Sequence, residues 1–64
     1  MNLVKIAEVR RTMEIQLDRL RELEQEMQSA KPPKQPQIRA QINLIAQDIR
    51  NLNTILQDLV ESTW

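Results

Sequence analysis

The chain has no cysteine, no histidine and no glycine, and a tryptophan is its single aromatic residue. Without cysteine there is no disulfide, and without cysteine and histidine the usual ligands of a structural zinc site are missing. The absence of histidine also removes the commonest general base, so neither Ser29 nor Ser62 has an imidazole to activate it. We therefore predict a non-enzymatic protein with no catalytic residue, no metal site and no cofactor.

Long hydrophobic runs and an excess of charge of one sign are also missing. No stretch approaches the length of about 20 apolar residues that crosses a bilayer as a helix. The nine basic and nine acidic residues give a net charge of zero. The chain thus lacks the positive excess on which general binding to nucleic acids and anionic membranes depends. We expect a cytoplasmic protein that does not associate with membranes and whose partners are proteins.

The three prolines of the chain all lie in one short segment near its middle, at residues 32, 33 and 36. Proline removes a backbone donor and keeps the preceding residue extended, so this segment interrupts any helix. On either side lie about 28 residues without glycine or proline, as expected for long helices. We predict one domain over residues 1–64, with a first helix at about 2–30, a connector at 31–36 and a second helix at about 36–63.

Apolar residues recur at alternating spacings of three and four on both sides of the connector. This is the heptad pattern of helices that pack at a shallow angle. We call these positions the seam: Ile6, Val9, Met13, Gln16, Leu20, Leu23, Met27 and Ala30, followed by Ile38, Ile42, Ile45, Ile49, Leu52, Leu56 and Leu59. The sequence therefore predicts an all-α fold, an antiparallel two-helix hairpin that resembles a coiled coil.

Apolar residues outside the seam indicate that the hairpin does not act alone. Leu3 and Leu17 flank the first seam, and Ile55 and Val60 flank the second. A helix with an apolar face this wide generally buries it against more than one neighbour. Small scaffolds without disulfides or metals usually oligomerise. We therefore expect these residues to lie in an interface, either in a homodimeric four-helix bundle or against a helix of another protein.

Gln16 is the polar member of the first seam, and two interpretations remain open for it. A seam amide that needs a partner can fix the register of the helices. In a hairpin that turns near residue 34, Gln16 lies at about the level of Leu52, between Asn51 and Asn53. Alternatively, Gln16 extends to the edge of the bundle while Leu17 takes its place inside.

Lys5, Arg10 and Arg11 form the one local basic cluster, which suggests a nucleic-acid contact as an alternative function. Acidic residues interrupt this cluster, and no aromatic residue is near it to stack on a base. In length and architecture the chain resembles plasmid copy-number hairpins of the ROP type. That resemblance implies a four-helix bundle that binds RNA, and it assigns no residue of this chain.

Trp64, the last residue, either covers the open end of the chain's own bundle or anchors the chain in a partner's pocket, since tryptophan is enriched at binding hot spots.

The favoured function is that of a protein-binding adaptor, regulatory subunit or co-chaperone. In size and layout the chain looks like the small hairpin co-chaperones of type III secretion needle subunits. A self-contained structural oligomer is the alternative.

Overall fold

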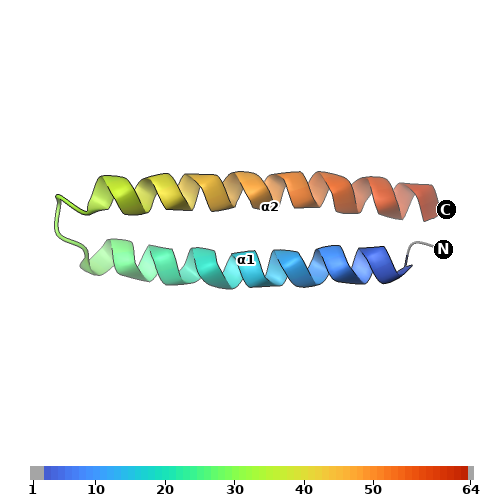
Figure 1. Ribbon diagram of the computed structural model, residues 1–64, viewed down its shortest axis with the longest axis horizontal. Helices are drawn as coiled ribbons and strands as arrows, with labels where there is room; N and C mark the ends of the chain where they lie inside the picture. The colour runs from blue at the N-terminus through green and yellow to red at the C-terminus, as the bar shows by residue number, and fades with distance from the viewer. Residues whose placement is uncertain (1–2, 64) are drawn as a thin grey trace.

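The computed structural model describes residues 3–63 and shows two long α-helices joined by a short connector (Figure 1). Helix α1 spans Leu3–Ser29 and helix α2 spans Gln35–Thr63. The helices pack side by side in opposite directions, so the start of α1 lies beside the end of α2 (Figure 1). This confirms the predicted all-α hairpin. Asn2, where the first helix was expected to begin, and Trp64 lie outside the described residues.

Helix α1 ends where the sequence turns to proline. The Ala30 amide donates to the Met27 carbonyl over 3.4 Å, a tight last turn of the 3₁₀ type. The Ser29 hydroxyl donates to the carbonyls of Gln25 and Glu26, at 3.4 and 3.3 Å. The helix stops there because Pro32 disfavours a helical conformation at the residue before it.

Helix α2 begins at Gln35, one residue earlier than the sequence suggests. The Ile38 amide donates to the Lys34 carbonyl over 3.2 Å, which makes Lys34 the capping residue. Pro36 is then the second residue of the helix rather than the first. It fits there because the first amides of a helix have no partner within the helix, so the missing donor of proline costs little.

The seam lies between the two helices, as its spacing predicts. Every seam residue is buried or half-buried, and most of the other helical residues are exposed. Within residues 3–63, however, Leu23 is the only hydrophobic side chain that is fully buried, with 1% of its surface exposed. The rest of the seam is half-buried because a single neighbouring helix covers only one stripe of each helix.

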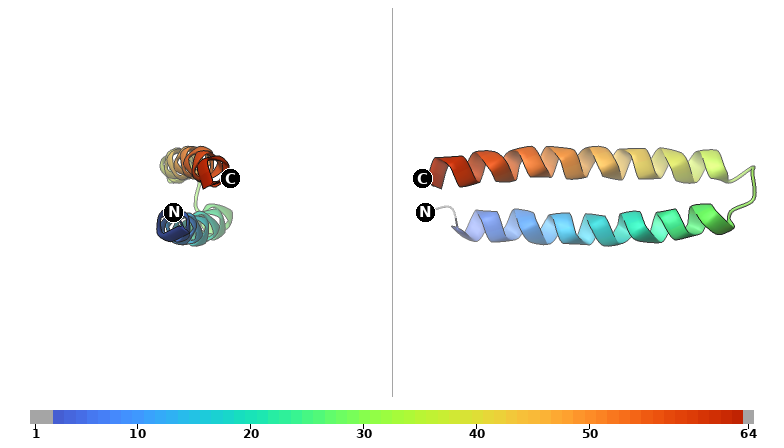
Figure 2. Two further views of the ribbon diagram at one scale, coloured as in Figure 1. Left: turned by 90° about the vertical axis from the view of Figure 1, so that its right-hand side faces the viewer. Right: turned by 180° about the vertical axis from the view of Figure 1, so that it is seen from behind.

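The hairpin is a rod rather than a compact body. Its radius of gyration is 14.9 Å and its extents are 49 × 14 × 10 Å, whereas a compact chain of this length has a radius of about 11 Å. Its accessible surface is 5323 Å², about 1,000 Å² more than the scaling law gives for a compact protein of 7.6 kDa. Seen end-on, the helices form one layer, and no third element of the described chain covers either broad side (Figure 2).

Candidate protein-interaction surface

The heptad positions divide the surface of the hairpin into two broad sides. With Ile6 and Met13 at position a and Val9 at position d, position e lies beside a, and position g lies beside d. In an antiparallel pair the e positions of both helices share one side of the layer, and the g positions share the other. We call them the Leu17 side, which has the e and b positions, and the Ile55 side, which has the g and c positions.

Three of the predicted interface residues lie on the Leu17 side. Leu3 is 58% exposed, and Leu17 and Val60 are each 37% exposed. Two open hollows lie along this side. One follows α1 and the other follows α2; they are lined by Leu3, Ile6, Ala7, Arg10, Arg11 and Glu14, and by Asn53, Leu56, Gln57, Val60 and Glu61. One seam residue lines each hollow, Ile6 in the first and Leu56 in the second, so this side gives access to half-covered seam residues.

Ile55, the fourth predicted interface residue, lies on the opposite side of the layer. It is 48% exposed, and it shares the Ile55 side with Ile15 and Leu44, which are exposed as well. The sequence grouped Ile55 with the other three because all four residues flank a seam. The antiparallel arrangement separates them, and the hairpin therefore has an apolar cluster on each broad side.

The two sides differ in charge. On the Leu17 side, basic residues exceed acidic ones: Arg10, Arg21, Arg39 and Arg50 against Glu14 and Glu24. On the Ile55 side the balance is reversed: Lys5 and Arg19 against Glu8, Glu22, Glu26, Asp48 and Asp58. Although the net charge of the chain is zero, the Ile55 side is thus acidic and the Leu17 side is mildly basic. An interface on either side has to accommodate these charges at its rim.

Gln16 occupies the seam position that its spacing gives it. It is half-buried, whereas Leu17 is exposed, so Leu17 does not take its place between the helices. Asn51 and Asn53 are exposed, and no hydrogen bond within the described chain joins either of them to Gln16. The predicted amide contact between Gln16 and these asparagines is therefore not formed within the described hairpin.

The basic residues singled out as a nucleic-acid contact do not form one patch. At 100° per residue, Lys5, Arg10 and Arg11 point in three directions around α1, each at least about 100° from the next. Arg10 and Arg11 line the hollow on the Leu17 side together with Glu14, and Lys5 does not. The next two arginines along α1 are engaged in exposed ion pairs, Arg19 with Glu22 at 3.5 Å and Arg21 with Asp18 at 3.4 Å.

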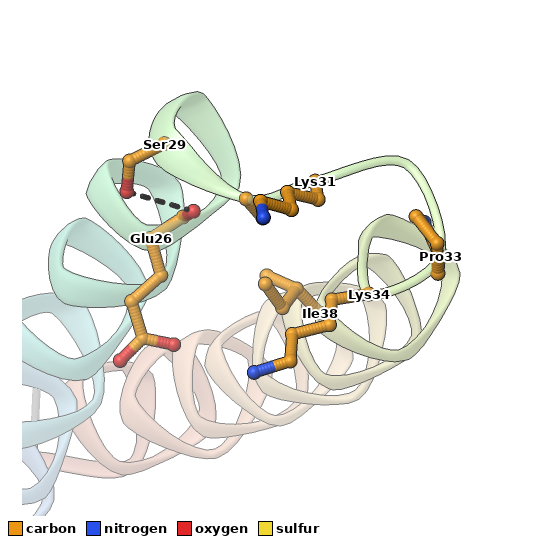
Figure 3. Close-up of a pocket in the computed structure, with 7 residues that line it drawn as sticks. Glu26, Ser29, Lys31, Pro33, Lys34 and Ile38 are labelled. Carbon is orange, nitrogen blue, oxygen red and sulfur yellow. Dashed lines mark hydrogen bonds between the residues drawn. The ribbon is translucent and has the colours of Figure 1, made fainter.

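A third hollow, of about 600 Å³, lies at the connector end of the hairpin. It is lined by Glu26, Ser29, Ala30, Lys31, Pro33, Lys34 and Ile38. Lys34 extends its ammonium group toward the side of the hollow where the Glu26 carboxylate lies (Figure 3). All its lining residues are exposed apart from Ala30 and Ile38, which are half-buried, and its charged residues are two lysines and one glutamate.

Two features of residues 3–63 bear on other kinds of site. No group of three or more acidic residues lies close enough together to hold a metal ion. Neither helix in this range is long and apolar enough to cross a membrane.

One structural contact was not visible in the sequence pattern. The side-chain amide of Gln35 donates to the Ala30 carbonyl over 3.2 Å, and Gln35 is half-buried. This bond satisfies a carbonyl just beyond the end of α1 and ties it to the first residue of α2. The presence of a glutamine in the proline segment does not predict this hydrogen bond, because the bond depends on how the chain reverses direction.

Comparisons of this chain with models of protein families, with curated proteins and with solved structures gave no match.

Proposed function

We propose that this chain is a non-enzymatic protein-binding module: an adaptor, regulatory subunit or co-chaperone that packs its apolar surface against helices. The observation that carries the proposal is the half-covered seam. Within the described residues only Leu23 is fully buried, and the remaining seam residues keep part of their apolar surface in contact with water.

A further helix, or a second hairpin, is the partner that fits this surface. The half-exposed seam residues and flanking residues such as Leu17 and Val60 form apolar stripes parallel to the long axis of the rod. A helix laid along the layer presents its own stripe at a matching period and buries both. Exposed apolar surface rimmed by charged residues is typical of protein interaction sites.

Two alternatives remain, and the geometry favours each of them less. A nucleic-acid regulator of the ROP type needs a continuous basic face, and Lys5, Arg10 and Arg11 point in different directions. A self-contained structural oligomer uses the same apolar surface. If it covers the Leu17 side, the apolar residues of the Ile55 side remain exposed to water. We therefore favour a module that binds another protein, with self-association as part of its assembly.

The proposal is tested by affinity capture from the cells that produce the chain. Immobilised hairpin is compared with the variants Leu17→Asp and Ile55→Asp, and with the control Gln47→Asp, whose exposed position lies on the outer surface away from both sides. Circular dichroism first establishes that each variant keeps its helix content. We expect a specific protein to be retained by the wild type and the control and lost with at least one interface variant. Retention by all variants alike, or no specific protein at all, would contradict the proposal.

A further inference from the structure

We propose that two copies of this chain associate through their Leu17 sides, with α1 of one copy antiparallel to α1 of the other. The two-fold axis passes beside Leu17 and runs perpendicular to the long axis of the rod. This inference rests on the proposed function, because it assigns one of the two apolar sides to self-association. It leaves the Ile55 side open for a different protein.

The charges on either side of Leu17 carry the proposal. Arg10 precedes Leu17 by seven residues and Glu24 follows it by seven, so all three lie on one stripe of α1. An antiparallel alignment centred on Leu17 places Arg10 against Glu24 of the second copy. The symmetry makes the same pair a second time, and Leu17 meets its own copy between them. A single stripe is thus complementary to itself.

The neighbouring stripe obeys the same rule. Glu14 and Arg21 are also seven residues apart, and their midpoint lies within one residue of Leu17. The alignment that pairs Arg10 with Glu24 therefore also brings Glu14 opposite Arg21 of the second copy. In the free hairpin Arg21 pairs with Asp18, but both side chains are more than 70% exposed. An ion pair this exposed contributes little and does not prevent Arg21 from turning to a new partner.

Helix α2 adds no attractive ion pair in this arrangement, and its Arg50 lies within about one residue of the axis, so the two exposed copies of Arg50 have to turn away from each other. Residue 17 lies at about the level of residue 51 in the hairpin, so the same axis passes close to the middle of α2. Asn53 lies near the axis, with Ala46 on one side of it and Val60 on the other. These residues share the e stripe of α2. The half-exposed seam residues beneath both stripes become the interior of the resulting four-helix bundle.

The Ile15 stripe of the Ile55 side fails the same comparison. Ile15 is its exposed apolar residue on α1, and the residues seven before and seven after it are Glu8 and Glu22. An antiparallel alignment centred on Ile15 therefore sets glutamate against glutamate twice. On the neighbouring stripe the same alignment brings Lys5 within one residue of Glu26 of the second copy, but the Ile55 side as a whole carries five acidic residues against two basic ones, and this excess selects the Leu17 side for self-association.

The available area is sufficient for a stable dimer. Two separate hairpins expose twice 5323 Å², whereas a compact protein of twice this mass exposes about 7,100 Å². The difference, about 3,500 Å², is an upper value for the buried surface, since a four-helix bundle is elongated. It exceeds the range of about 1,200–2,000 Å² that specific interfaces bury.

Charge reversal tests the pairing directly. Arg10→Glu sets glutamate against Glu24 of the second copy, and Glu24→Arg sets arginine against Arg10. We expect each variant alone to dimerise roughly tenfold or more weakly than the wild type in sedimentation equilibrium, because two attractive pairs become repulsive. An equimolar mixture of the two variants restores both pairs, so it forms a heterodimer about as tightly as the wild type dimerises.

The matched control is Glu8→Arg, a charge reversal on the Ile55 side at a comparable exposed position of α1. It should leave the dimerisation constant unchanged. Wild-type hairpin that stays monomeric at every concentration overturns the proposal, as do charge variants that dimerise like the wild type. A mixture no tighter than its separate components does so as well. A variant that is helical only in the mixture still supports the pairing, because it folds when the complementary variant is present.

Cysteine substitution gives a second measurement, because the chain has no native cysteine. Leu17→Cys places the new thiol next to its own copy at the two-fold axis, so we expect rapid formation of a disulfide-linked dimer under oxidising conditions. Ile15→Cys, on the opposite side, should cross-link much more slowly. Equal rates would overturn the proposal. None of these results depends on a captured partner, so failure of the dimer is distinguishable from failure of the protein-binding function.

Discussion

Leu23 is the residue whose truncation should most clearly reveal what holds the hairpin together. It is the only fully buried hydrophobic side chain in residues 3–63, with 1% of its surface exposed. The change Leu23→Ala removes most of that side chain from the contact between α1 and α2, in the half of α1 nearer the connector. If the folded state depends on this contact, no other truncation on α1 should cost as much.

The expected cost follows from the burial. Truncation of a buried leucine to alanine costs about 2–5 kcal/mol in protein cores. The lower half of that range applies here, about 2–3 kcal/mol, because the half-buried neighbours of Leu23 can move into the gap. A protein of this length has a total stability of about 3–10 kcal/mol. A loss of this size lowers the melting temperature of a small domain by about 10–20 °C.

Thermal and urea denaturation followed by circular dichroism at 222 nm measures this cost. Leu20→Ala and Leu44→Ala are the matched controls, because the same atoms are removed from a half-buried position and from one that is 65% exposed. The second control should change stability by no more than about 0.5 kcal/mol. All chains are compared at one concentration, since self-association makes the melting temperature depend on concentration.

The order of the three truncations is the critical result. Leu23→Ala should be the most destabilising, Leu20→Ala intermediate and Leu44→Ala nearly neutral. If Leu44→Ala costs as much as Leu23→Ala, then the free hairpin is not the folded unit, and the exposed side chains are buried in an assembly that dominates its stability. The reasoning from burial within one chain would then be refuted.

The remaining predictions concern single polar groups. Gln35→Ala removes the hydrogen bond to the Ala30 carbonyl and should cost about 1 kcal/mol in urea denaturation; Gln37→Ala in the same turn is the control, and equal effects would mean that the bond contributes nothing. Gln16→Leu replaces a half-buried amide with an apolar side chain and should raise stability by about 1 kcal/mol; a decrease would show that the amide has a partner in the folded assembly. Glu22→Gln removes an exposed ion pair and should change stability by less than about 0.5 kcal/mol, even at low salt, where a larger loss would contradict this.

The fold follows from two features of the sequence that act at different ranges. The heptad spacing determines which residues face each other, and it needs no information beyond the order of the side chains. The proline segment determines where the chain reverses. Together they predict the hairpin, the seam and the position of its polar member Gln16. Helix α2 begins at Gln35, within one residue of the expected start, because Lys34 caps the helix.

The degree of burial along the seam could not be predicted in the same way. The spacing predicts the same degree of burial for every seam residue, but among the described residues only Leu23 is fully buried. Coverage depends on the size of the side chains in neighbouring layers and on how closely the helices approach, which periodicity does not specify. The hydrogen bond between Gln35 and Ala30 could not be predicted from the sequence either, because it depends on the path of the connector.

The candidate surface required the antiparallel arrangement before its residues could be sorted. Leu17 and Ile15 are both exposed branched aliphatic residues of α1, two positions apart, and exposure alone does not separate their roles. The charges one heptad away on either side do: Arg10 and Glu24 make the Leu17 stripe complementary to itself, whereas Glu8 and Glu22 make the Ile15 stripe repel its own copy. An exposed apolar residue supplies area for association on either side of the hairpin. The sign of the charges around it decides whether the partner is a second copy of the chain or a different protein.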